Sequence, residues 1–287
     1  MKILRNADVI NFYAGYTFWP IALKNNRLYN LLAASDVAWL KRMGKKVILH
    51  FQGCEIRDRY NPLAKSVCAH CAIRDTYCSP LNSAKRRSRL HRAVAVADAV
   101  TVSTPDLISY IDRDEVFFVP KIAPDDVDAF QPRRYSEAAR LRVIHAPTSR
   151  SIKGTDRIEA VLNKHPEKFE LILLEGKSRE EVYEAAENAH LAVDQIRVGW
   201  YGNFAVEMMQ RGLPVVARTR DDLRRAVLPA RVPLIDADES NFEAVMLALH
   251  ADRSRLADAR SAGLKYIRDV HSAKSVGQRL LSIYESI

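Results

Sequence analysis

The sequence predicts an α/β protein with mostly parallel sheets, divided into two domains. Short apolar runs alternate with amphipathic helical segments along most of the chain, which is the pattern of βαβ units. With 287 residues, the chain is long enough for two ordinary hydrophobic cores. A segment near the middle contains Pro120, Pro124 and Pro132 among acidic and basic residues, which is typical of a linker.

The expected elements alternate in order along the chain. A helix is expected over residues 29–43, ending at Gly44, followed by a buried strand over residues 47–51. Further strands are expected at residues 99–103, 116–119, 141–145, 169–174, 191–194, 214–217 and 233–235. A terminal helix with one apolar face is expected within residues 271–287. In such folds, ligands bind beyond the carboxyl ends of the parallel strands.

Composition and charge limit the classes of function. Hydrophobic residues make up 48% and charged residues 28%, which excludes a disordered or fibrous chain. The net charge of +9 favours an anionic partner such as a phosphate ligand, an acidic membrane surface or a nucleic acid. The uncharged run 9–23 contains Pro20 and is too short to span a bilayer. Because charged residues interrupt the place of a signal peptide, we expect a cytoplasmic protein.

A cationic turn follows the strand expected at residues 141–145. Arg150, Lys153 and Gly154 are expected on the loop between this strand and a helix that begins at Thr155. Gly154 lets the backbone approach a ligand closely, and free amides at the start of a helix attract anions. Arg150 offers a planar fork to phosphate oxygens, and Lys153 offers a point charge. The alternative is that both are solvated loop cations.

A second turn carries glycines and a single carboxylate. Residues 199–202 follow the strand expected at 191–194, and a helix is expected from about Asn203. Glu207, one turn into this helix, is placed to accept hydrogen bonds from two ribose hydroxyl groups. The alternative is a surface glutamate, although its apolar neighbours Val206 and Met208 indicate a partly buried position.

These residues resemble a known family. Arg150 and Lys153-Gly154, followed by Gly202-Asn203-Phe204-Ala205-Val206-Glu207 and Gly212-Leu213-Pro214, are similar to the donor-binding domain of retaining nucleotide-sugar glycosyltransferases. This family, glycosyltransferase family 4 or group 1, has two Rossmann-like domains in the GT-B architecture. The likeness covers roughly residues 100–287 and includes Ser103-Thr104-Pro105-Asp106-Leu107. Residues 47–57 match the family's amino-terminal domain more loosely.

The resemblance implies a separate role for each domain. Residues 1–128 would form an acceptor-side domain in shortened form, residues 129–270 the domain that binds the nucleotide sugar, and residues 271–287 a carboxyl-terminal helix. The family transfers a hexose or similar sugar, with retention and without a required metal, from a UDP- or GDP-sugar to a glycan, lipid-linked or other acceptor. A role in the assembly of a surface polysaccharide or another glycoconjugate would follow.

The resemblance also assigns roles to single residues. Arg150 and Lys153 would neutralise the departing diphosphate. Glu207 would bind the ribose, and Glu175-Gly176 would lie near the base. The leaving phosphate itself would deprotonate the acceptor, so the protein needs no nucleophile.

Three positions differ from the family pattern. The family has an acidic residue that contacts the donor sugar eight positions before the ribose carboxylate, where this chain has Gly199. Only Ser151 and Ile152 separate Arg150 from Lys153, whereas the family has four intervening residues. The family opens with a strand and a glycine-rich loop, so we expect either a shortened first domain or a missing start.

A histidine is the second-last residue of the strand expected at residues 47–51. His50 lies where the resemblance places an acceptor-facing strand end, followed by Gln52-Gly53, Glu55 and Arg57. A histidine there could act as a base or donate a hydrogen bond. The alternative is a core histidine with satisfied hydrogen bonds.

All four cysteines lie within a short segment of the first domain. Cys54, Cys68, Cys71 and Cys78 supply enough thiolates for a tetrahedral structural Zn²⁺ or for an iron–sulfur cluster. Free thiols or disulfides are the alternative, and a reducing cytoplasm argues against two stable disulfides. We expect any metal to brace the fold rather than to take part in catalysis.

A cationic run follows the cysteines. Lys85, Arg86, Arg87, Arg89 and Arg92 lie on an expected helix with one apolar face. Such a helix can lie against anionic lipid, which would allow peripheral contact with a membrane. The alternative is the solvated outer face of a helix.

Three functions therefore follow from the sequence. The first is a nucleotide-sugar glycosyltransferase. The second is a protein of the same fold that binds a nucleotide or a partner enzyme without transferring sugar. The third and weakest is a zinc-dependent nucleic-acid binder, since few aromatic residues accompany the cations for base stacking.

Overall fold

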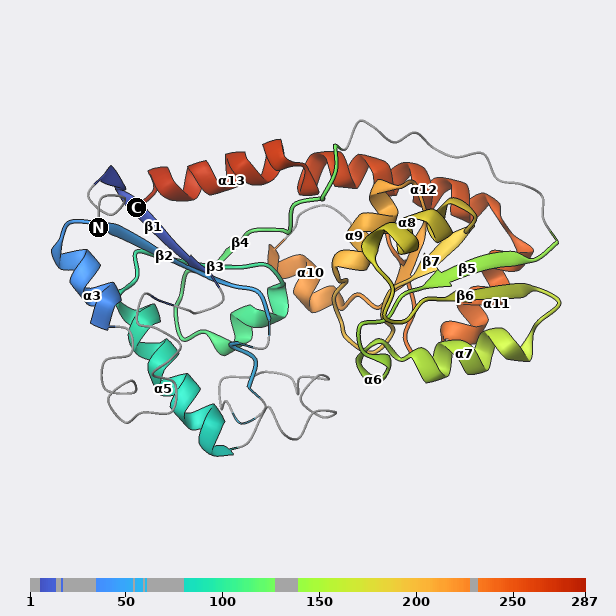
Figure 1. Cartoon of the computed structure of the whole chain (residues 1–287), viewed down its shortest axis with the longest axis horizontal. Helices are drawn as coiled ribbons and strands as arrows, with labels where there is room; N and C mark the ends of the chain where they lie inside the picture. Colours follow the sequence, from blue (N-terminus) through green and yellow to red (C-terminus); the bar gives the residue numbers. More distant parts are fainter. Residues whose placement is uncertain are drawn as a thin grey trace. The chain divides into compact units, whose positions relative to one another are not determined.

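The computed structural model describes residues 6–13, 17, 35–53, 55–58, 60, 80–126, 139–227 and 232–287 (Figure 1). The chain forms two compact units. The first comprises Met1–Pro120 with Gly277–Ile287, and the second comprises Lys121–Val276. No helix in the described ranges is long and apolar enough to cross a membrane.

The first unit contains a four-stranded parallel sheet with the strand order β1-β2-β3-β4. Its described elements are β1 (Val9–Tyr13), α3 (Ser35–Arg42), β2 (Lys46–Phe51), α5 (Pro80–Val96), β3 (Ala99–Val102), the 3₁₀ helix η2 (Pro105–Tyr110) and β4 (Phe117–Phe118). Strands β2 and β3 are buried over nearly their whole length, as expected for central strands of a parallel sheet.

The second unit contains a five-stranded parallel sheet with the order β6-β5-β7-β8-β9. Its strands are β5 (Leu141–His145), β6 (Phe169–Leu173), β7 (Leu191–Val193), β8 (Val215–Ala217) and β9 (Ile235–Asp236). Its helices are α6 (Arg150–Lys153), α7 (Thr155–Lys164), α8 (Arg179–Glu187), α9 (Asn203–Gln210), α10 (Asp221–Val227), α11 (Phe242–Ala251), α12 (Ser254–Tyr266) and the π-helical η3 (Ile267–His271). The last helix, α13 (Ala273–Glu285), begins here and ends among the residues of the first unit.

Helices cover both faces of the second sheet (Figure 1). Helix α7 packs on β6 with α11, whereas α9 packs on β7 and β8 with α12. The two faces follow from the strand order, because the chain moves outward from β5 to β6 and then returns past β5 to β7, and crossovers are right-handed. The direction of winding therefore reverses between β5 and β7, which is where α/β sheets bind ligands.

The predicted strands are confirmed, with ends that differ by up to two residues. The strand at 141–145 is found as predicted, and the expected strand at 233–235 is shifted to Ile235–Asp236. The helix expected at 29–43 is described from Ser35 to Arg42. Residues 127–138 lie outside the described residues, so the domain boundary after residue 128 stays a prediction. The two compact units divide at Pro120, and α13 contributes to both.

A buried hydrogen-bonded chain ends at His271, which is 1% exposed. Its Nδ1 donates to the Lys121 carbonyl over 2.6 Å, so its Nε2 accepts from the Tyr201 hydroxyl over 3.0 Å. The Tyr201 hydroxyl oxygen in turn accepts from Tyr266 over 2.8 Å. Burial lowers the pKa of His271 from 6.5 to about 4, because the charged form would lose its hydration.

His271 therefore makes stability depend on pH. Between pH 6.5 and about 4 the unfolded chain binds a proton that the native histidine does not, so stability falls as pH falls through this window. We expect a loss of about 1.4 kcal/mol per pH unit from this residue. The free energy of unfolding should depend less steeply on pH in His271→Asn. Its pH dependence should be unchanged in His91→Asn, which replaces an exposed histidine of the first unit. Urea denaturation between pH 4 and 7 measures this free energy, and equal slopes in the wild type and both variants would contradict the assignment to His271.

Candidate functional site

The carboxyl edge of the second sheet brings most of the predicted site residues together. In the order of the strands, Glu175 follows β6, Arg150 and Lys153 follow β5, Asp194 follows β7, and Arg220 follows β8. Because all these strands are parallel, the loops after them meet at one edge. The site is therefore centred on the point between β5 and β7 where the winding reverses.

Arg150 and Lys153 lie on a short helix rather than on a loop, so the prediction that they lie on a loop is wrong. Ser149 is extended, and backbone bonds from Lys153 to Ser149 and from Gly154 to Arg150 close a single helical turn. Gly154 ends it with a φ of +81°, a conformation that glycine adopts without strain. A side chain on Gly154 would also lie 2.7 Å from Ile196, so packing as well as backbone conformation requires the glycine.

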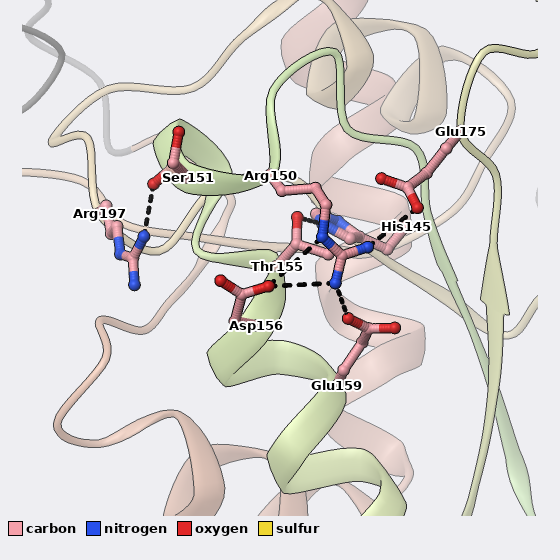
Figure 2. Close-up of polar contacts among 8 residues, drawn as sticks. All are labelled: His145, Arg150, Ser151, Thr155, Asp156, Glu159, Glu175 and Arg197. Atoms are coloured by element: carbon pink, nitrogen blue, oxygen red, sulfur yellow. Dashed lines mark hydrogen bonds and ion pairs between the residues drawn. The ribbon is translucent and has the colours of Figure 1, made fainter. Parts of the chain in front are cut away.

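The Arg150 guanidinium lies among three carboxylates (Figure 2). It contacts Glu175 over 2.9 Å and Asp156 over 3.1 Å, and it pairs with Glu159. The carboxylates of Glu159 and Asp156 raise the pKa of Arg150. Its side chain is 40% exposed, so these ion pairs lie at the surface, where such pairs contribute little to stability.

Lys153 has a different environment, because its partner is completely buried. The ammonium group pairs with Asp194, whose side chain is 0% exposed, and the Lys153 side chain is 11% exposed. The second carboxylate oxygen of Asp194 accepts a hydrogen bond from the Gly202 amide over 2.6 Å. A side chain on Gly202 would lie 3.2 Å from Lys153 Nζ, so the glycine makes room for this pair. Asp194 thus joins the cationic turn after β5 to the start of α9.

Asp194 was not predicted as a site residue. The sequence signal was an Asp-Gln pair directly after the apolar run of β7, where a buried polar residue needs partners. Its neighbour Gln195 donates from its side chain to the Trp200 carbonyl, and the Gly199 carbonyl accepts from the Arg220 amide over 3.0 Å. Together with the buried Tyr201 hydroxyl, these bonds fasten each residue of the 199–202 turn.

A second unpredicted residue, Arg197, holds the cationic turn from outside. Its guanidinium donates to the Ser151 carbonyl over 2.5 Å (Figure 2) and pairs with Glu239 over 2.8 Å.

At the base of the turn, His145 is completely buried. It contacts the Val193 carbonyl over 2.7 Å and the Thr155 hydroxyl over 2.8 Å, and burial lowers its pKa.

Glu207 is half-buried on α9, with 15% of its side chain exposed. Burial raises its pKa, while Arg179 and Arg211 act in the opposite direction. Arg179, the first residue of α8, lies 3.7 Å from the carboxylate. Arg211 lies over the Tyr183 ring, with its guanidinium carbon 3.4 Å from the ring centroid. The carboxylate therefore faces the start of α8, on the β6 side of the site.

The remaining predicted residues lie partly at the edge of the second sheet and partly in the first unit. Gly176, with a φ of +66°, lies beside exposed Glu175, and Gly202 with exposed Asn203 and half-buried Phe204 begins α9. In the first unit, His50 is 4% exposed and lies 2.7 Å from the Thr101 hydroxyl, with its ring 4.6 Å from that of Tyr13. This arrangement shows a buried histidine with a polar partner. Its proposed role toward an acceptor stays a prediction.

The cysteines lie outside the described residues, as do most side chains of the cationic run on α5. Two side chains of this run are described: Arg92 is exposed, and Arg87 pairs with Asp58 over 3.3 Å and donates to the Tyr60 carbonyl over 2.6 Å. Within the described part of the chain, no three His, Cys, Asp or Glu side chains gather where they could hold a metal ion. The zinc and iron–sulfur predictions therefore stay predictions.

Comparison with known proteins places the fold. No family model matches the sequence, and no curated protein gives a significant match. The structure is similar to sucrose-phosphate synthase from Thermosynechococcus elongatus, with a TM-score of 0.62 and 14% identity over 97% of this chain and 73% of that one. It is similar to Anabaena HepE in complex with UDP-glucose, with a TM-score of 0.60 and 13% identity over 100% of this chain and 81% of that one. It is also similar to TarM, with a TM-score of 0.53 and 14% identity over 86% of this chain and 53% of that one.

These similarities define a class at the level of the fold. The chain is an α/β protein with parallel sheets, and its structural neighbours are GT-B glycosyltransferases. The GT-B fold predicted from the residues of the second domain is therefore confirmed.

Removing Asp194 should destabilise the second unit. Asp194→Ala leaves the Lys153 charge buried without its partner, and breaking a buried pair in this way costs about 3–5 kcal/mol. Urea denaturation measures the loss.

The double variant Lys153→Met with Asp194→Asn removes both charges while keeping an acceptor for the Gly202 amide. It should therefore lose less free energy of unfolding than Asp194→Ala. Asp221→Ala, in an exposed pair with Arg224, should change stability by less than about 0.5 kcal/mol. Equal losses in the single and double variants would argue against a buried charge pair.

Proposed function

We propose that the protein is a nucleotide-sugar glycosyltransferase whose donor binds at the carboxyl edge of the second sheet. The observation that carries the proposal is the convergence of Arg150, Lys153, the Gly202 turn and Glu207 at the reversal point between β5 and β7. HepE, which shares the fold, is described in complexes with UDP-glucose and with UDP. The shared fold, together with the cations and the carboxylate at this edge, supports a UDP- or GDP-sugar here.

The two cations of the site have separate tasks in this proposal. Arg150 is exposed and paired only with surface carboxylates among the contacts described above, so a donor diphosphate can replace those carboxylates at little cost. Its planar fork then binds two phosphate oxygens. Lys153 stays with Asp194 because that carboxylate is buried, and it holds the glycine turn in place while its remaining N–H groups face the diphosphate.

The nucleoside is assigned to the β6 side. Glu207 would accept hydrogen bonds from the ribose hydroxyls, and its raised pKa reflects a carboxylate that lacks full solvation until a ligand donates to it. Glu175-Gly176, at the end of β6, would lie beside the base. Arg179 closes this side as the first residue of α8.

The chemistry proposed for this site is electrostatic. As the bond to the sugar breaks, negative charge grows on the diphosphate, and fixed donors from Arg150 and Lys153 stabilise it. The departing phosphate would take the proton of the acceptor hydroxyl, and the sugar would be transferred with retention. The acceptor, a glycan or lipid-linked molecule, is assigned to the first unit.

A second candidate is a protein that binds a nucleotide without transferring sugar. The observation that favours it is Gly199, which supplies no side chain where the related enzymes have an acidic one. The two candidates differ in a donor hydrolysis or transfer assay, since both bind the nucleotide but only one releases sugar.

Arg150→Ala should weaken binding of the diphosphate. Hydrogen bonds to charged groups contribute about 1.5–3 kcal/mol, so we expect the Kd for UDP or GDP, and for inorganic pyrophosphate, to rise by about 10- to 100-fold. Calorimetry measures the Kd, and the melting temperature should not change. Arg140→Ala is the matched control, because this arginine is similarly exposed and paired with Glu170 but lies just before β5, at the other end of the strand. Undiminished binding by Arg150→Ala would contradict the proposed diphosphate site.

Glu207→Gln should affect the nucleoside and leave the phosphates unaffected. The amide accepts fewer and weaker hydrogen bonds than a carboxylate, so the Kd for UDP or GDP should rise by about tenfold. The Kd for pyrophosphate should stay at the wild-type value, since pyrophosphate has no ribose. A parallel loss of both ligands would show that Glu207 supports the fold of the site instead of contacting ribose.

A further inference from the structure

Gly199 lies directly under the side chain of Arg220. A Cβ built on Gly199 would lie 2.5 Å from Arg220 Cγ, which is closer than real Cβ contacts, and 3.3 Å from Arg220 Cβ. The described glycines with positive φ do not include Gly199, so its backbone conformation does not require glycine. Arg220 occupies the space that a side chain at position 199 would take, so any other residue there would have to displace the arginine.

The guanidinium of Arg220 is held by a carboxylate two residues further along. Its Nε contacts one oxygen of Asp222 over 3.1 Å, and its Nη2 contacts the other over 2.6 Å. This pairing lowers the pKa of Asp222, whose side chain is 62% exposed. Both side chains reach the surface beside the 199–202 turn, and guanidinium and carboxylate groups are both able to bind sugar hydroxyls.

The order of the strands indicates which part of a donor would reach this pair. Glu207 and Arg179 place the nucleoside on the β6 side, and the diphosphate lies over β5 and β7. The group beyond the diphosphate then extends toward β8, where Gly199 and Arg220 meet. This step rests on the proposed function, because it takes the direction of the donor from the diphosphate and ribose assignments.

We propose that Arg220 and Asp222 form the specificity-determining contact to the transferred sugar and that they favour a neutral hexose. The pair supplies the polar groups that position 199 lacks. Asp222 contacts Arg220 through both of its oxygens, so a sugar carboxylate at this pair would meet a negative charge together with the positive one and would gain less than from an arginine alone.

The test compares the Kd for a nucleotide sugar with the Kd for its nucleotide. We expect Asp222→Asn and Arg220→Met each to raise the ratio of the UDP-glucose Kd to the UDP Kd by about tenfold, with the UDP Kd unchanged. If the protein binds GDP instead of UDP, the ratio of the GDP-mannose Kd to the GDP Kd is measured in the same way. Asp221→Asn is the matched control, since Asp221 also begins α10 and is 67% exposed but pairs with Arg224 and Arg225. UDP-glucuronate should bind more weakly than UDP-glucose to the wild type, and Asp222→Asn should narrow that difference.

The outcomes separate this inference from the function on which it rests. Normal UDP binding with an unchanged ratio in both variants overturns the role of the pair, and so does a wild type that prefers UDP-glucuronate. A wild type that binds neither UDP nor GDP overturns the proposed function together with the sugar contact. Melting temperatures within the range of the Asp221→Asn control show that the variants are folded.

Discussion

The buried pair between Lys153 and Asp194 is the interaction on which the rest of the site depends. It crosses the boundary between β5 and β7, where the winding of the second sheet reverses. A fully buried carboxylate requires a partner, because an isolated charge without water is strongly unfavourable. The pair therefore fixes two turns relative to each other, and through the Gly202 amide it also fixes the start of α9.

The other contacts of the site follow from this constraint. With Gly202 held, the preceding residues of the turn are fastened by Gln195, by the buried Tyr201 hydroxyl and by the Arg220 amide. Exposed and buried charges then have different functions. Surface pairs such as those of Arg150 can exchange partners with a ligand, whereas the buried pair serves as a fixed scaffold. In the proposed donor site, carboxylates of the chain itself thus balance the cations that a diphosphate would contact.

Much of the fold could be predicted because its signals are local. The apolar runs of β2, β5 and β7 and the helical period of α7 are visible in short windows of sequence, and these elements were found close to their expected ends. The turn at residues 150–153 was missed, because one helical turn has no period to detect and the position of Gly154 fits a loop equally well. Arg150, Lys153, Gly202 and Glu207 could be proposed as neighbours because parallel strands bring their following loops to one edge.

The sequence by itself determined the α/β class, the sheet edge at which chemistry-bearing residues gather, and the absence of an acid at position 199. Only the tertiary structure decided what those residues do for one another. That Lys153 is neutralised by Asp194, that Arg150 is shared among three carboxylates, and that Arg220 fills the space above Gly199 all depend on residues distant in sequence or on side-chain direction. Local patterns do not encode these pairings, because burial and strand order, which determine which charges meet, arise only when the whole sheet is formed.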